Sequence, residues 1–232
     1  MTQIFSLVLS GDVVTPGGTI RNGWVAVEGE RIAALGDGAE PDAARRVDAR
    51  GSLVLPGVID GQTHAGSQFG FPGLEQTTRS AVAGGITTLV DMPYDEPDPV
   101  ANVEILGRKI EAVARFGYCD VALYGTVLND GDLDGVEPLI ESGVCAFKVS
   151  SFENHPSRFP RITNDRMLAL MERLAPTDVP LGLHNEDQEI VRATIARHRA
   201  ERRTAGHDHS PSRPEVAELV ATSAFLEMGR AT

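Results

Sequence analysis

Short apolar runs alternate with longer amphipathic stretches between residues 53 and 184. The runs have the length of buried strands and cover 54–60, 85–92, 120–125, 145–150 and 180–184. The stretches between them predict helices at 74–85, 102–117, 133–143 and 162–175. Alternation of apolar strands with helices is typical of parallel βαβ units, whose sheet is buried on both faces.

The stretch 102–117 carries a strong helical pattern. Five apolar side chains fall on one face at helical spacing, which predicts that this face packs inward. They are Val103, Leu106, Ile110, Val113 and Ala114. Gly117 follows as an expected C-cap.

The two ends of the chain differ from this middle part. Residues 1–52 hold short β-branched runs separated by Gly-Asp, Pro-Gly-Gly and Arg-Asn-Gly, which predict short antiparallel strands. After residue 185 we expect a long helix, a polar loop at 205–214 and a further helix at 215–228. We therefore divide the chain into an N-terminal β segment, 1–52, and an α/β region, 53–232.

The length of the second region argues for an unfinished barrel. A closed eight-stranded (β/α) barrel takes about 250 residues, whereas 53–232 provides five predicted strands. A complete smaller α/β fold is the alternative, although an open flavodoxin-like sheet would not explain the polar residues described below. A partial barrel of about five βα units exposes its edge strands. We therefore expect the isolated chain to aggregate, to form a homo-oligomer or to depend on a missing C-terminal half.

Net charge and hydropathy exclude some partners. The formal charge is −12, and an acidic surface repels nucleic-acid phosphates and anionic membranes. No stretch approaches the ~20 apolar residues of a membrane span, and the N-terminus lacks the features of a signal peptide. The expected location is the cytoplasm.

Polar residues that follow the predicted strands are the candidates for chemistry. In a parallel barrel, active sites are built at the C-terminal ends of the strands. Gln62 and His64 follow the first run, Asp91 ends the second, Lys148 lies in the fourth and His184 ends the fifth. The i, i+2 spacing of Gln62 and His64 places both side chains on one face of an extended chain.

Each candidate also has a structural interpretation. His64 could be a hydrogen-bonded loop histidine, and His184 a capping or merely polar residue. Lys148 could extend its amine to the strand end, or it could be desolvated and neutral, and then react with carbon dioxide to give an anionic carbamate. The remaining histidines are predicted to lie at the surface, namely His155, His198, His207 and His209.

Four segments together resemble the amidohydrolase superfamily, in its dihydroorotase, allantoinase and hydantoinase branch of cyclic amidohydrolases. They are VLPGVIDGQTH (54–64), AVAGGITTLVDMP (81–93), AFKVSSFE (146–153) and GLHNED (182–187). The segment 27–36 is similar to the strands of this family's N-terminal β-sandwich. The resemblance implies an α/β fold in which a small sandwich segment precedes an incomplete TIM-like barrel, the N-terminal half of such an enzyme.

The resemblance also implies the chemistry. It implies one or two divalent metal ions, commonly zinc, held by His64, His184 and a carboxylated Lys148, with Lys148 counted among the catalytic groups. The implied reaction is hydrolysis of a C–N bond in a cyclic amide by a metal-activated water. The implied substrate is hydantoin, allantoin or a related ureide or imide, and no substrate-binding residue is assigned.

Three departures from the family pattern qualify this hypothesis. Gln62 stands where the family has its first metal-binding histidine, and an amide oxygen is a weaker ligand than imidazole. Gly66 stands where dihydroorotases carry an arginine for the substrate carboxylate. The sixth-strand histidine and eighth-strand aspartate of the family are outside this sequence. A non-catalytic binding or assembly protein built on the same fold is therefore the alternative.

Overall fold

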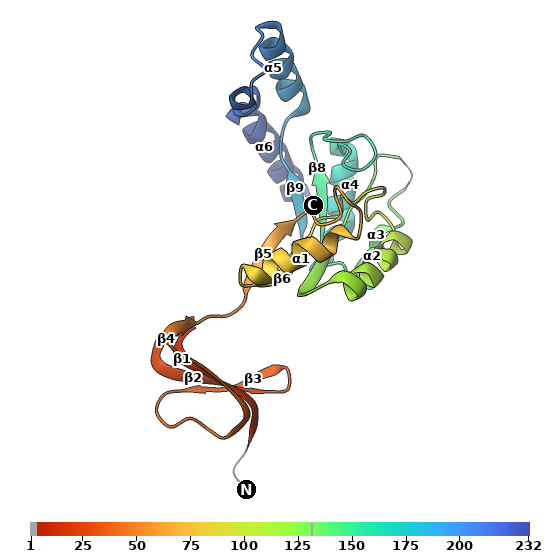
Figure 1. Cartoon of the computed structure of the whole chain (residues 1–232). Coiled ribbons are helices and arrows are strands. Elements are labelled where there is room, and N and C mark those ends of the chain that lie inside the picture. Colours follow the sequence, from red (N-terminus) through yellow and green to blue (C-terminus); the bar gives the residue numbers. More distant parts are fainter. Residues whose placement is uncertain (1–3, 131) are drawn as a thin grey trace. The chain divides into compact units, whose positions relative to one another are not determined.

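The chain folds as two compact units, Met1–Val58 and Ile59–Thr232. The computed structural model describes residues 4–130 and 132–232, and Figure 1 shows the elements of each unit. The boundary predicted after residue 52 falls inside the last strand of the first unit. Each unit is described below by itself.

The first unit is a four-stranded sheet in the order β3-β2-β1-β4. Its strands are β1 (Phe5–Thr15), β2 (Gly18–Glu28), β3 (Arg31–Gly36) and β4 (Ala43–Val54). The first three pair antiparallel as predicted, but β4 pairs with β1 in parallel. Val8, Val13, Val25 and Ala26 are buried on this sheet.

The apolar run predicted as the strand 54–60 is divided between the two units. Val54 is the last residue of β4, where it pairs with Val13 of β1. Pro56 has no N–H to donate to a strand ladder, and the first strand of the second unit, β5, spans Val58–Thr63. The expected strand is therefore displaced toward the C-terminus, and Gln62 lies within β5 rather than after it.

The second unit is built on a curled five-stranded sheet in the order β5-β6-β7-β8-β9. The later strands are β6 (Ile86–Asp91), β7 (Asp120–Gly125), β8 (Ala146–Ser150) and β9 (Leu181–His184), and they pair in parallel. The predicted fold class, an incomplete α/β barrel after a small β unit, is confirmed. The two edge strands of this sheet are β5 and β9.

Helices follow the strands of the second unit, as Figure 1 shows. Leu139, Phe147, Val149 and Leu170 belong to the core cluster that joins the sheet to α3 and α4. No helix of the described residues is long and apolar enough to cross a lipid bilayer. The helices are α1 (Gly73–Ala83), α2 (Val103–Phe116), α3 (Val136–Glu141), α4 (Asn164–Leu174), α5 (Gln188–Ala200) and α6 (Glu215–Ala231), with 3₁₀ turns at Gly206–Asp208 and Ser210–Ser212 before α6.

Helix α2 buries a face that overlaps only in part with the predicted one: Leu106 is buried as predicted, and Val113 packs against the core. Val103 and Ile110 are 45% and 47% exposed. The buried residues are Ile105, Leu106, Lys109 and Ala112. Lys109, whose burial was not predicted from the sequence, is completely enclosed.

Candidate metal centre

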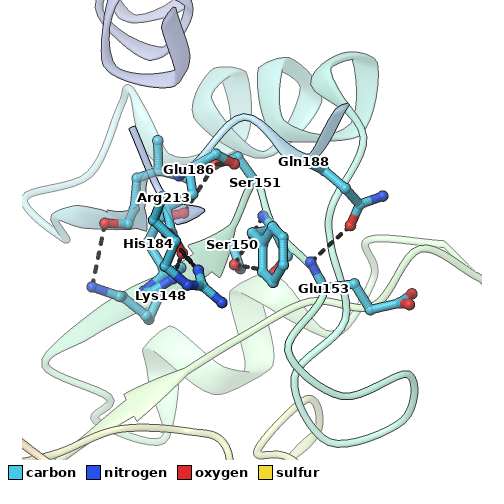
Figure 2. Close-up of polar contacts among 10 residues, drawn as sticks. Lys148, Ser150, Ser151, Glu153, His184, Glu186, Gln188 and Arg213 are labelled. Atoms are coloured by element: carbon cyan, nitrogen blue, oxygen red, sulfur yellow. Dashed lines mark hydrogen bonds and ion pairs between the residues drawn. The ribbon is translucent and has the colours of Figure 1, made fainter. Parts of the chain in front are cut away.

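Lys148 and His184 lie on one face of neighbouring strands. In the parallel pairing of β8 with β9, Lys148 is opposite Gly182 and Ser150 is opposite His184. Residues two apart on a strand point to the same face, so the lysine and the histidine share a face at the carboxyl end of the sheet. Figure 2 shows both side chains in one group with Glu186 and Arg213.

The amine of Lys148 has no acidic partner among the described residues. Its polar contact is a long hydrogen bond, 3.4 Å, from Nζ to the carbonyl of Leu183. Gly182 leaves room for the side chain, since a Cβ there would meet Lys148 Cδ at 3.2 Å. Burial lowers the pKa of Lys148, because a desolvated ammonium is less stable than the neutral amine.

The backbone carbonyl of Lys148 is held by two side chains. Its carbonyl accepts hydrogen bonds from Thr126 Oγ1 at 2.7 Å and from the Tyr94 hydroxyl at 3.2 Å. The Tyr94 ring is stacked on Phe159 at 3.7 Å, and Phe159 meets the His184 ring edge-on at 5.4 Å. A continuous aromatic contact therefore joins the backbone of one candidate to the ring of the other.

The ring of His184 is bonded to a buried carboxylate. Its Nε2 lies 2.9 Å from Oε2 of Glu186, which is 8% exposed. Arg213 contacts both carboxylate oxygens of Glu186 through Nη1. Burial alone would raise the pKa of Glu186, but the bonds and charges of Arg213 and His184 outweigh it, so this pKa is lowered.

His64 lies just after β5, at the opposite edge of the sheet. Its Nδ1 is 3.4 Å from Ser67 Oγ, a weak contact. The residue keeps some exposed surface, but burial of its ring lowers the pKa of His64. The negative charge of Asp91 opposes this shift, and the positive charge of Lys148 adds to it. The charge of Lys148 is therefore among the influences on the ring of His64.

A buried ion cluster supports the chain around His64. Asp91 Oδ1 accepts hydrogen bonds from Thr63 Oγ1 and Ala65 N, both at 2.8 Å. The ammonium of Lys109 lies 2.7 Å from Asp91 Oδ2 and 2.8 Å from Asp95 Oδ2. Because Thr63 and Ala65 flank His64, Asp91 holds the chain on both sides of it, through the Thr63 hydroxyl and the Ala65 backbone N–H.

Like Asp95, Lys109 was not predicted from the sequence to belong to this cluster. It is fully buried and donates a further hydrogen bond, 2.8 Å, to the carbonyl of Met92. The sequence did carry a signal, because Lys109 lies on the same side of the helix as Ile105, at i−4, and Ala112, at i+3. A lysine aligned with apolar neighbours at that spacing indicates a buried cation with acidic partners.

Gly66 is packed against the second carboxylate of the cluster. A Cβ at this position would lie 2.1 Å from Asp95 Oδ1. Asp95 is 1% exposed, and burial raises its pKa to about 6 against the opposing charge of Lys109. No side chain fits at residue 66 without displacing Asp95, so an arginine is sterically excluded.

In the predicted set of metal ligands, Lys148 is the residue that would supply a negatively charged donor. Among the described residues, no three His, Cys, Asp or Glu side chains come together in a way that could hold a metal ion. The predicted set instead combines two histidines, a lysine and Gln62, which is exposed on β5. Such a set fits a divalent cation when the amine of Lys148 is converted to an anionic oxygen donor.

One of the histidines predicted at the surface is buried. His198 of α5 is 4% exposed and its Nε2 lies 3.0 Å from Arg203 Nη1. The prediction for His198 was wrong because the polar sequence of this helix does not show that Arg203, which follows the helix, packs against it. His207 and His209 are exposed as predicted.

Comparison with known proteins finds similar sequences over nearly the whole chain. The allantoinase of Solibacter usitatus is 34% identical over 93% of the chain and 47% of its own length. The allantoinase of Streptomyces avermitilis is 32% identical over 99% of the chain and 51% of its own length. No protein-family profile matches the chain.

Solved structures give the same picture for the fold. The L-hydantoinase from Arthrobacter aurescens superposes with a TM-score of 0.91 at 23% identity, over 98% of this chain and 51% of that one. Dihydropyrimidinase from Brevibacillus agri gives a TM-score of 0.82 at 22% identity, over 97% and 49%. The chain spans about half the length of the relatives it matches.

Proposed function

Because the chain belongs to the cyclic-amidohydrolase branch of the amidohydrolase superfamily, where it corresponds to the N-terminal half, we propose that it supplies half of a metal-dependent cyclic amidase. The proposed reaction is hydrolysis of a C–N bond in a cyclic amide by an activated water. Similarity to allantoinases and the hydantoinase fold support the reaction class. The substrate is a small neutral ring, and no nucleic acid or membrane takes part.

The observation that carries this proposal is the environment of Lys148. The amine is half-buried without an acidic partner among the described residues, on the same face as His184. A structural lysine in such a position would need an anion to offset its desolvation. The depressed pKa instead favours the neutral amine, which can attack carbon dioxide, lose one proton and become an anionic carbamate.

The lysine content of the chain supports the same reading. Lys109 and Lys148 are the only lysines in the sequence, and the other basic side chains are arginines. An arginine stays protonated and cannot form a carbamate, whereas a lysine whose pKa is lowered by burial can. Lys109 is held as a cation between two carboxylates, so Lys148 is the lysine free to react.

The proposed metal ligands are His64, His184 and the carbamate of Lys148, with Gln62 as a weaker fourth. A divalent ion bound there, zinc in our proposal, would polarise the ring carbonyl and lower the pKa of a water. The protein holds the ligands ready: Asp91 fixes the backbone at His64, and Glu186 fixes the ring of His184. Gln62 leads us to propose that one of two ions is weakly bound or absent.

Gly66 narrows the proposed substrate. The close approach of Asp95 excludes a carboxylate-binding arginine at this position, so the site lacks the group expected for an acidic ring substrate. The similar proteins of Solibacter usitatus and Streptomyces avermitilis are named allantoinases. We therefore place allantoin and similar uncharged ureides ahead of carboxylated rings.

Metal analysis with a substrate panel tests the proposal. The 232-residue chain is loaded with zinc in bicarbonate, and hydrolysis of allantoin, hydantoin and a dihydropyrimidine is measured, alone and with any C-terminal half encoded downstream. We expect bound zinc in the native chain and its loss in Lys148→Ala. A complete, folded protein with neither bound metal nor turnover on the panel would sink the proposal.

Gln62 favours a second candidate, a binding or assembly protein that has lost its metal site. The variant Gln62→His separates the two, because imidazole restores the ligand type that the family uses. In an enzyme, Gln62→His raises zinc content and leaves or increases turnover. In a non-catalytic relative, zinc content rises without turnover.

A further inference from the structure

We propose that Arg213 is a positioning residue for His184 and acts through Glu186. The inference rests on the proposed function only where it takes His184 as a metal ligand. The geometry of the three side chains stands independently of any metal. It links the segment between α5 and α6, predicted as a polar surface loop, to the candidate metal centre.

Glu186 determines which nitrogen of His184 carries the proton. An ionised carboxylate accepts hydrogen bonds and donates none. Both oxygens of Glu186 are paired with Nη1 of Arg213, as expected for a carboxylate, and Oε2 is 2.9 Å from Nε2 of His184. The Nε2 of the ring must therefore carry hydrogen, which leaves the lone pair of Nδ1 available to a metal ion.

Arg213 holds Glu186 in the position that this bond requires. Its Nη1 contacts both carboxylate oxygens, and its guanidinium lies over the ring of Phe152 at 4.8 Å. The cation supplies the charge that a buried carboxylate needs. Without it, Glu186 would turn toward solvent or other donors, and the ring of His184 would lose its fixed orientation.

The backbone ties the same segments together. Ser151 Oγ lies 3.0 Å from the carbonyl of His184 and 2.9 Å from both the carbonyl and the N–H of Glu186. The backbone N–H of Asp187 donates a hydrogen bond, 3.0 Å, to the carbonyl of Ala217 in α6. Figure 2 shows Arg213 beside Glu186 and His184, with Glu153 and Gln188 on the far side of Ser151.

The test compares Arg213→Met with Arg213→Lys and with a matched control. Methionine keeps the packing on Phe152 and removes the charge and the hydrogen bonds. Arg192→Met is the control, because Arg192 forms an exposed ion pair with Glu153 at 3.0 Å outside the cluster. Zinc affinity is measured by competition with a chromogenic chelator, after circular dichroism has checked that each variant is folded.

Loss of an outer partner of a metal ligand weakens metal binding by about 10- to 100-fold. We expect a loss in that range for Arg213→Met, partial recovery in Arg213→Lys and no more than about a twofold change in the control. Unchanged zinc affinity in folded Arg213→Met overturns the inference. If that variant does not fold, Glu186→Gln replaces it, and unchanged affinity there overturns the inference equally.

A second readout needs no metal. Nitrogen-15 NMR of the metal-free protein reports the tautomer of the His184 ring. We expect one tautomer with hydrogen on Nε2 in the native chain and in Arg192→Met, and a tautomer mixture in Arg213→Met. A single unchanged tautomer in Arg213→Met contradicts the positioning role of Arg213. A native chain that binds no zinc but shows the expected tautomer pattern contradicts only the proposed function.

Discussion

The two histidines at the edges of the half-barrel sheet are supported in different ways. At the β9 end, Glu186 bonds directly to the ring of His184, and Arg213 neutralises that carboxylate. At the β5 end, Asp91 accepts hydrogen bonds from the side chain of Thr63 and the backbone N–H of Ala65, the residues on either side of His64. The one polar contact found for the His64 ring among the described residues is with Ser67 Oγ, at 3.4 Å. The first arrangement orients a ring, whereas the second positions a segment of chain.

This difference indicates which side of the proposed metal centre has its side chains already oriented. The ring of His184 is held by Glu186 and shares a face with Lys148, whose amine has no acidic partner among the described residues. The ring of His64 has a weak polar contact with Ser67 and lacks a carboxylate partner among the described residues. We infer that the Lys148 and His184 side of the centre is formed before metal binding, and that His64 completes it.

The charge balance of the two ends also differs. Glu186 is matched by one arginine, whereas Asp91 and Asp95 share the single ammonium of Lys109. One of the two carboxylates on Lys109 is therefore poorly compensated, which is consistent with the pKa of about 6 for Asp95. The β5 end should be the more sensitive to loss of its cation and to pH.

Lys109→Met should have the largest effect on folding. Removing one partner of a buried ion cluster destabilises a protein by about 3–5 kcal/mol, because the remaining charges have neither water nor a counter-ion. Guanidinium unfolding followed by circular dichroism measures this loss. The corresponding change at the partly exposed β9 end, Arg213→Met, should cost less.

The double variant Lys109→Met with Asp95→Asn is the matched control for this experiment. Taking away one of the uncompensated carboxylates should return part of the lost free energy of unfolding. If Lys109→Met unfolds at the same denaturant concentration as the native chain, the cluster does not hold the β5 end together as described.

The next largest effect is a dependence of stability on pH. The pKa of Asp95 is raised from 3.8 to about 6 in the folded chain. Between those values the folded state binds more protons than the unfolded one, so the free energy of unfolding falls as pH rises, by up to about 1.4 kcal/mol per unit from this group. Asp95→Asn should flatten the slope in urea unfolding from pH 4 to 6.5, and an identical slope in both proteins would rule this out.

Gly66→Ala should give a smaller loss. The added methyl would lie 2.1 Å from Asp95 Oδ1, and overpacking of this kind costs about 1–3 kcal/mol. Gly61→Ala is the control, since nothing lies within 4 Å of a Cβ there. Equal thermal stability of the two variants would show that Asp95 can move aside and that residue 66 does not restrict the substrate.

The architecture was open to prediction because strong local patterns determine it. Apolar runs bounded by polar residues located β6 to β9 within a residue or so, and Lys148 and His184 emerged as polar residues in or at the end of such runs. Their common face follows from strand periodicity once the parallel register is known. The N-terminal turns likewise predicted most of the first sheet.

What escaped prediction depends on contacts between distant segments. Lys109 and Asp95 meet only when α2 packs on the β6 end, and Arg213 reaches Glu186 from 27 residues further along the chain. Tertiary packing also determines the parallel pairing of β4 with β1 and the division of the run 54–60 between two strands. Local propensity does not encode the partner of a charged side chain, so the supports of both histidines were missed while the histidines themselves were found.

The most direct test of the account is detection of a carbamate on Lys148. The folded chain is equilibrated with carbon-13 bicarbonate and zinc, and its carbon-13 NMR spectrum is compared with that of Lys148→Ala. We predict a carbamate resonance that zinc strengthens and that is absent from the variant, since Lys109 is held protonated between Asp91 and Asp95. A folded native chain whose spectrum matches that of Lys148→Ala would contradict the account.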